Sequence, residues 1–221
     1  MYEPFSVRSF RFQWPADLMA SWAFEMETII LGWYVLTITD SVLVLTIFAS
    51  MQWLGTLIAP YLGVLGDRWG RRTMLCLLRA SYLTTSIITM SLALTDTLNA
   101  SIILGISFVI GLVRPSDLVM RNGLIGDTMH GNILMKAMGV SRTTMDSARI
   151  AGALLGASLF SLLGIGFAYV AVTLFYVISL LLTFGVSSVR TQTGRENGII
   201  NRSPLTDLKE GLLCVWKTPT L

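Results

Sequence analysis

Residues 150–189 read IAGALLGASLFSLLGIGFAYVAVTLFYVISLLLTFGVSSV, which is a run of forty residues without a single charge. A helix that crosses the hydrocarbon core of a bilayer needs about twenty mostly apolar residues. The run is therefore long enough for two such helices and too long for one. Gly164 and Gly166 stand near its middle, and two glycines in three residues suit a tight turn. We predict two membrane-spanning helices here, at residues 138–162 and 167–188.

The rest of the chain continues this pattern. Residues 41–66 also lack charged residues, and three more apolar stretches are of membrane-spanning length. We predict an all-α, polytopic membrane protein whose other helices cover residues 13–38, 42–65, 73–95 and 99–122. Only 13% of the 221 residues are charged, against about 25% in soluble domains. This composition excludes a soluble domain, a disordered chain and a nucleic-acid-binding module. One histidine and two cysteines leave little for a metal site.

Lysine and arginine residues mark one side of the predicted bundle. They occur before the first helix, between the second and third, between the fourth and fifth, and after the sixth. The other loops, near Asp40, Asp96 and Gly164, contain none. Loops rich in Lys and Arg remain in the cytoplasm. The sequence therefore predicts a multi-pass protein of the cell (inner) membrane with both termini in the cytoplasm.

Several charged residues fall inside the predicted helices, where ionisable groups are costly and are candidates for function. Glu25 and Glu27 lie near the middle of the first helix, and two positions on a helix point about 200° apart. One can therefore face the bundle interior while the other faces a neighbouring helix. Two interpretations are open: at least one glutamate couples transport to a proton or substrate, or one pairs with a buried arginine for structure alone.

The fourth and fifth predicted helices carry matching stripes of charge. The stripes are Arg114, Asp117 and Arg121 on the fourth helix and Arg142, Asp146 and Arg149 on the fifth. Spacings of three and four residues put each stripe on one helix face. We favour an internal polar network, which makes Arg114, Asp117, Asp146 and Arg149 candidates for proton coupling or substrate binding. The alternative is that long side chains extend to lipid phosphates, which suits Arg79, Arg121 and Arg142.

The loop between the second and third predicted helices reads Gly63-Val64-Leu65-Gly66-Asp67-Arg68-Trp69-Gly70-Arg71-Arg72. Gly63 and Gly66 permit close packing against another helix, and Gly70 permits a tight turn. A carboxylate beside three arginines at a helix junction can hold or release neighbouring helices by changing its ion-pair partners. Alternatively, the three arginines serve only to keep the loop in the cytoplasm.

This loop resembles the signature of the major facilitator superfamily, which has a glycine, three residues, Asp-Arg, any residue, a glycine and two basic residues. The resemblance implies half of a twelve-helix fold, built as two inverted three-helix repeats, with the substrate site between the halves. It also implies that Asp67 stabilises the outward-facing state. Arg68, Arg71 and Arg72 would then pair with acids near the end of the fourth helix, where Asp127 is the candidate.

A second motif lies on the fifth predicted helix. Gly152 and Gly156 are similar to part of the antiporter motif of that superfamily, while Ala153 and Ala157 replace its proline and a further glycine. The same spacing suits helix packing alone, which is the alternative. Other local patterns, such as Arg114-Pro115, resemble the exporter branch that includes the enterobactin exporter and macrolide efflux proteins. That resemblance implies export.

Residues 1–189 form the predicted bundle, and residues 190–221 begin as a polar cytoplasmic linker. Ser203 and Pro204 can start a helix. Apolar residues follow at spacings of three and four, which predicts an amphipathic helix. The sequence ends at Leu221, where the resemblance puts the start of a seventh span. We therefore expect a fragment or truncated product whose partner is a missing C-terminal six-helix half.

The sequence thus predicts half of a secondary active transporter. It would use a proton gradient, and no cofactor, to export hydrophobic or amphipathic small molecules across the lipid bilayer by alternating access. The alternative is a homodimeric six-helix membrane scaffold or a channel without coupled transport. An enzyme is not expected, because the chain has no P-loop and because His130 falls in a predicted loop, away from the serines in the membrane.

Overall fold

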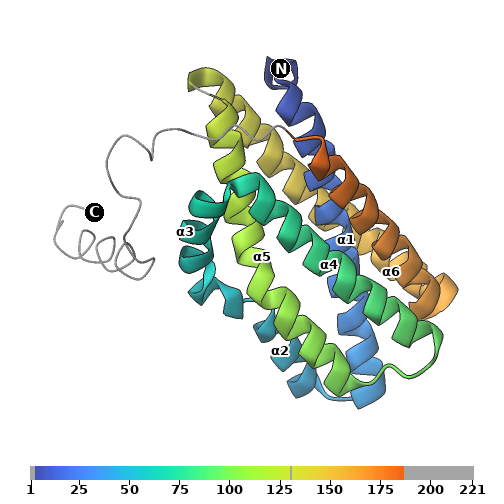
Figure 1. Cartoon of the computed structure of the whole chain (residues 1–221). Coiled ribbons are helices and arrows are strands. Elements are labelled where there is room, and N and C mark those ends of the chain that lie inside the picture. The colour runs from blue at the N-terminus through green and yellow to red at the C-terminus, as the bar shows by residue number, and fades with distance from the viewer. Residues whose placement is uncertain (1–2, 130, 187–221) are drawn as a thin grey trace.

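The computed structural model describes residues 3–129 and 131–186, and within them it forms a bundle of long helices without strands (Figure 1). A short 3-10 helix, η1, covers Glu3–Ser6, and α1 covers Arg8–Thr39. The residue after α1 is Asp40, which adopts a left-handed conformation with φ 46° and donates its backbone N–H to the carbonyl of Leu36. This arrangement ends the helix and turns the chain back toward the bundle.

The second predicted helix is broken. It consists of α2 (Val42–Met51), a 3-10 helix η2 (Leu54–Leu57) and α3 (Ala59–Trp69), with a bend of 46° at the break. Pro60 lies in the first turn of α3, where its missing N–H lets a helix begin but not continue from the preceding turn. Gly55 lies directly against the backbone of Gly111. The prediction of one continuous helix over 42–65 is therefore wrong, because the proline and this close contact interrupt it.

The third and fourth predicted helices correspond to α4 (Arg71–Leu94) and α5 (Ala100–Thr128). Gly70, with φ 93°, makes the turn between α3 and α4. The side chain of Asn99 caps α5 by accepting a hydrogen bond of 3.1 Å from the backbone N–H of Ile102. The predicted limits are close to the observed ones, except that α5 continues past residue 122 to Thr128.

The last element, α6 (Gly131–Phe184), contains a break at Gly164, whose φ of 75° and ψ of 177° are nearly exclusive to glycine. Before the break, Gly152 lies against Trp22 of α1 and Gly156 lies against Met26, so this part of α6 runs parallel to α1. After the break, Tyr169 contacts Glu27 and Ser179 contacts Ala16, so this part of α6 runs antiparallel to α1. The chain therefore reverses along α1 at Gly164, where the two glycines predict a turn.

Among the described helices, α4, α5 and α6 are long and apolar enough to cross a membrane. The bent pair α2–α3 makes a fourth candidate if it counts as one span. The chain is thus an all-α membrane protein. A total of six crossings and the division into two inverted repeats remain predictions. The amphipathic helix expected within residues 190–221 lies outside the described residues.

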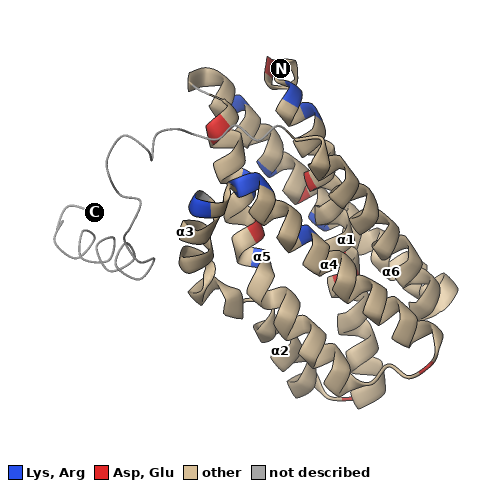
Figure 2. Ribbon diagram, in the orientation of Figure 1, with Lys and Arg blue, Asp and Glu red and all other residues tan. Residues whose placement is uncertain are grey.

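Charges are distributed unevenly along the bundle (Figure 2). Lys and Arg gather at the end that holds the start of α1 and the turns after α3 and α5, which we name the basic end. Its basic residues are Arg8, Arg11, Arg68, Arg71, Arg72 and Lys136. The turns at the other end contain Asp40 and Asp96. An apolar core that includes Ile30, Ile103 and Val172 is buried between α1, α5 and α6.

Candidate functional site

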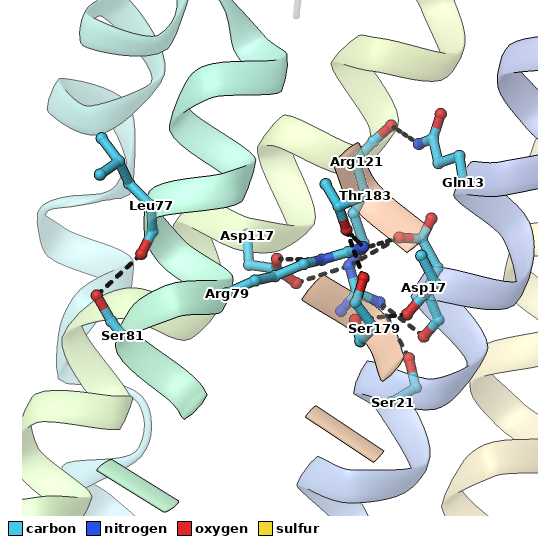
Figure 3. A network of polar contacts seen from close by, with 11 residues as sticks. Gln13, Asp17, Ser21, Leu77, Arg79, Ser81, Asp117, Arg121, Ser179 and Thr183 are labelled. Atoms are coloured by element: carbon cyan, nitrogen blue, oxygen red, sulfur yellow. Dashed lines mark hydrogen bonds and ion pairs between the residues drawn. The ribbon is translucent and has the colours of Figure 1, made fainter. Parts of the chain in front are cut away.

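Four buried charged residues meet inside the bundle: Asp17 from α1, Arg79 from α4, and Asp117 and Arg121 from α5 (Figure 3). We name them the charge quartet. The Nε of Arg121 lies 2.6 Å from an oxygen of Asp117 and 3.6 Å from an oxygen of Asp17. Arg79 pairs with Asp17 and lies 4.0 Å from Asp117. The four residues are only 1% to 6% exposed, and their charges sum to zero. Opposite charges in equal number are what a low-dielectric site tolerates best.

Neutral groups add hydrogen bonds to the charge quartet. Arg121 donates to the hydroxyl of Ser21 at 3.0 Å, and Arg79 donates to the hydroxyl of Thr183. The side-chain amide of Gln13 donates to the backbone carbonyl of Arg121 at 3.0 Å. These contacts join α1, α4, α5 and the second part of α6. The quartet therefore fixes four helices relative to one another.

Sequence reasoning predicted only part of this quartet. It identified Asp117 as internal, but the alternative in which Arg79 and Arg121 extend to lipid phosphates is wrong, because both are buried against carboxylates. It also missed Asp17. A signal was available, since no Lys or Arg stands three or four positions from Asp17 on its own helix. An acid without a local partner inside a membrane helix needs a cation from another helix.

A cavity of about 760 Å³ lies beside the quartet, between α1, α3, α5 and the first part of α6. Phe24, Trp53, Val119 and Met145 contribute apolar surface to it. A second cavity of about 750 Å³ adjoins the first. Glu25, Trp53, Arg114 and Arg149 line both cavities. These four residues therefore form the wall that the two cavities share.

Three charged residues of this wall form what we name the cavity group: Glu25, Arg114 and Arg149. One oxygen of Glu25 lies 3.5 Å from a guanidinium nitrogen of Arg114 and 3.9 Å from the Nε of Arg149. The guanidinium carbon of Arg114 also lies 3.5 Å from the ring centroid of Phe24, a cation–π contact. These ion-pair distances are longer than those of a tight salt bridge, so the cavity group is loosely paired.

Glu27 has quite different surroundings. It is buried, and its two carboxylate oxygens accept hydrogen bonds from Tyr169 at 3.1 Å and Tyr176 at 2.8 Å. Tyr176 in turn stacks on Tyr82, which lines the first cavity. No cation among residues 3–129 and 131–186 pairs with Glu27. The two glutamates thus point to opposite sides of α1, one to charged partners and one to neutral ones.

Asp146 does not join the internal network that its spacing predicts. Its side chain is 55% exposed and lies 3.8 Å from Arg142 and 4.0 Å from Arg149 on the same helix. No described helix covers this face of α6, so the expectation of an internal Asp146 is wrong for the described chain. Arg142 is 71% exposed, and it also lines the first cavity. Arg149 is also exposed, but it reaches Glu25.

The loop at the basic end connects three helices. Arg71 donates to Asp127 at 2.8 Å and to the backbone carbonyl of Gly123 at 2.8 Å, so the predicted partner Asp127 lies in contact with it. Arg72 donates to the carbonyl of Phe184 at the end of α6, at 2.6 Å. Arg68 is exposed at the end of α3, and the side chain of Asp67 lies outside the described part. Gly63 lines the first cavity.

Gly152 and Gly156 bring α6 close to α1. A Cβ atom on Gly152 would lie 2.9 Å from the Cβ of Glu25, and one on Gly156 would lie 2.8 Å from the Cα of Met26. Side chains at these positions would push the two helices apart, which would move the cavity group. Within residues 3–129 and 131–186, no three His, Cys, Asp or Glu side chains gather into a set that could hold a metal ion.

Known proteins similar to this chain agree with the fold. The model of a major facilitator family, described as transmembrane secretion effector, matches residues 1–201. The structure is similar to the crystal structure of the human organic anion transporter MFSD10 (TETRAN), with a TM-score of 0.63 and 18% identity over 81% of this chain. At that identity the likeness shows the fold alone. The chain spans 47% of the length of that transporter. No curated protein sequence matches the chain.

Proposed function

The chain belongs to the major facilitator superfamily, and we propose that it forms one six-helix half of a secondary active transporter. The family comprises transporters rather than enzymes. In this proposal a second bundle of similar size completes the protein, and the 47% coverage of the structural neighbour supports it. The protein resides in the cell (inner) membrane with both termini in the cytoplasm, which the positions of Lys and Arg support.

The observation that carries the proposal is the first cavity with its charged wall. Its volume of about 760 Å³ is within the range of about 300–1,000 Å³ that small-molecule sites occupy. Phe24, Trp53 and Met145 offer surface to a hydrophobic or amphipathic substrate. Alternating access then exposes this cavity to one side of the membrane at a time, as the two halves rock about it.

We propose a proton gradient as the energy source, without a resident cofactor, and export as the direction. Glu27 is the candidate for the coupling proton. Its partners Tyr169 and Tyr176 are neutral, so a proton gained or lost there changes the charge of the pocket with no cation to offset it. Tyr176 and Tyr82 connect that event to the cavity.

The loop at the basic end is the proposed switch between the two states. Arg71 and Arg72 tie the start of α4 to α5 and to the end of α6. Exchange of partners at Arg71, Asp127 and Asp67 would release these helices together. An Asp127→Asn variant should therefore alter the transport rate more than the affinity for substrate.

The test is a flux measurement on the protein extracted from its own membrane. The intact mass of the purified protein is measured first, and a mass near twice that of residues 1–221 is expected. It is then reconstituted in liposomes that enclose a pH-sensitive dye, and rhodamine 6G or 8-anilinonaphthalene-1-sulfonate is added. Flux of the compound should depend on the proton gradient and should stop when a protonophore collapses it. Ion current or dye flux that persists without the gradient would favour a channel.

Two matched variants distinguish the roles of Glu25 and Glu27 in the same assay. Glu27→Gln should abolish the proton dependence of flux while the protein keeps its fold. Glu25→Gln, two residues away, should change the affinity for substrate and leave the proton dependence in place. Full proton-coupled flux in both variants would contradict the coupling role of α1.

A further inference from the structure

We propose that the cavity selects an amphipathic anion, and that Glu25 is its built-in competitor, which occupies the cavity arginines until the anion arrives. This inference rests on the proposed function, because it names the substrate class of the same cavity. The inference concerns the substrate that binds in the cavity and not the ion that drives transport. Three observations carry it: the balance of charge, the position of Arg114 and the loose pairing of Glu25.

The balance of charge at the cavity is positive. Asp117 and Arg121 also reach its wall, but both belong to the charge quartet, which is neutral as a whole. The charges that remain around the cavity are Arg114, Arg142 and Arg149 against Glu25 and Asp146. One positive charge is therefore in excess. An anion restores neutrality at this wall, whereas a cation adds to the excess.

Arg114 is held ready for such a ligand. The ring of Phe24 lies 3.5 Å from its guanidinium carbon and that of Trp53 lies 5.5 Å away, so aromatic contacts fix its position. A guanidinium has five N–H donors. The two hydrogen bonds described for Arg114, to Gln52 and Glu25, are each 3.5 Å long. Charge-assisted hydrogen bonds are usually about 2.7–2.9 Å long, so Arg114 has donors to offer an oxyanion.

Glu25 is the group that an anion would replace. One of its oxygens is shared between Arg114 and Arg149 at 3.5 and 3.9 Å, and neither contact is tight. The side chain of Glu25 lines the cavity and is 17% exposed, so it has space to turn when an anion takes its place. Two charged groups face it, Arg114 from α5 and Arg149 from α6, while α2 and η2 present no charge. Phe24 and Trp53 then contact the apolar part of the ligand.

The experiment compares three ligands that share one ring system and differ in charge. They are naphthalene-2-sulfonate, 2-naphthylmethylammonium and naphthalene-2-methanol. Binding to the full chain in phosphatidylcholine nanodiscs is measured by equilibrium dialysis, with empty nanodiscs subtracted. The sulfonate should bind roughly tenfold more tightly than the ammonium. Equal binding of all three ligands, preference for the ammonium, or no binding of the sulfonate would overturn the proposal.

Two variants and one control test which residues determine the preference for an anion. Glu25→Gln should raise the affinity for the sulfonate roughly tenfold and leave the alcohol unchanged, because an anion no longer competes with a like charge. Arg114→Gln should abolish the preference for the sulfonate. Asp96→Asn, at the far end of the bundle, should change neither. A gain of affinity cannot come from a misfolded protein, so Glu25→Gln keeps the test decisive even if Arg114→Gln fails to fold. Weaker sulfonate binding in Glu25→Gln would overturn the proposal.

A lipid headgroup and a free anion offer the same chemistry, and a second set of nanodiscs distinguishes them. With phosphatidylglycerol added, an unchanged affinity for the sulfonate assigns the site to a free amphipathic anion. Competition by phosphatidylglycerol assigns it to an anionic lipid. Either result supports an anion site. Failure of charge selection together with proton-dependent flux in liposomes would overturn this inference and leave the proposed transport function standing.

Discussion

The charge quartet and the cavity group use the same residue types in opposite ways. In the quartet, two aspartates and two arginines balance each other, are nearly inaccessible and include a contact of 2.6 Å. In the cavity group, one glutamate faces two arginines at 3.5 and 3.9 Å, and the arginines are partly exposed. The first arrangement is buried and neutral without a ligand. The second carries a net charge of +1 and lines a cavity, and this difference separates a structural ion cluster from a binding site.

The largest expected effect comes from removing one charge of the quartet. Arg79→Gln leaves Asp17 and Asp117 with one arginine in a buried site, and breaking such a pair costs about 3–5 kcal/mol. The free energy of unfolding in mixed micelles with dodecyl sulfate measures it. Arg142→Gln, at an exposed arginine, is the matched control and should change stability by less than about 0.5 kcal/mol. Equal losses would erase the distinction between buried and exposed arginines.

A double variant tests whether the stability of the charge quartet depends on equal numbers of positive and negative charges rather than on any one residue. Asp17→Asn combined with Arg79→Gln removes one charge of each sign and leaves the pair Asp117–Arg121 intact. It should recover about 1–3 kcal/mol of the stability lost in Arg79→Gln alone, because contacting residues are coupled. The same unfolding measurement gives the coupling energy. Additive losses would mean that the two residues act independently.

The cavity wall depends on backbone packing more than on ion pairs. A Cβ atom on Gly111 would overlap the carbonyl of Met51 and lie 2.9 Å from the Cα of Gln52, so Gly111→Ala must displace the segment that carries Gln52 and Trp53. Overpacking of this kind costs about 1–3 kcal/mol. Gly105→Ala is the matched control on the same helix, because nothing lies within 4 Å of its Cβ position. A stable Gly111→Ala variant with unchanged ligand binding would contradict this role.

Arg114→Gln should cost far less stability than Arg79→Gln. Its contact with Glu25 is long and both side chains are partly exposed, so we expect the pair to contribute about 1 kcal/mol or less. Its main effect should be on anion binding. Unfolding free energy and sulfonate affinity, measured on the same preparation, separate the two. A loss of stability as large as that of Arg79→Gln would place Arg114 with the quartet.

The smallest effect concerns an exposed pair at the basic end. The Nζ of Lys136 lies 2.6 Å from Glu3, and this hydrogen bond, with the lysine charge, holds the pKa of Glu3 below its usual value of 4.5. The contribution of the pair is present above the pKa of the unfolded chain and is lost as pH falls through the lowered pKa of the folded state. Lys136→Gln should raise the pKa of Glu3 toward 4.5, as followed by NMR of the glutamate carboxyl carbons. No shift would mean that the pair does not form in solution.

Local patterns in the sequence predicted the helices well. Uncharged runs and paired glycines indicate where helices lie and where the chain turns, as Gly70 and Gly164 illustrate. These features depend on neighbours in sequence, which is why they can be read without a structure. Pro60 was a local signal too, but the break near it also needs the contact between Gly55 and α5, which no local pattern reveals.

Asp117 and Arg121 pair within α5, at a spacing that the sequence shows. The partners that the buried charges have on other helices could not be predicted. The sequence by itself determined that the chain is helical, membrane-embedded and a major facilitator, and that charges lie within its helices. Only the tertiary structure decided that Asp17 and Arg79 complete a neutral cluster, and that Glu25 is the glutamate that faces arginines while Glu27 faces tyrosines. Helix formation and membrane insertion follow from composition over tens of residues. The energy of a buried charge, in contrast, depends on which residues far apart in sequence lie within a few ångströms of it.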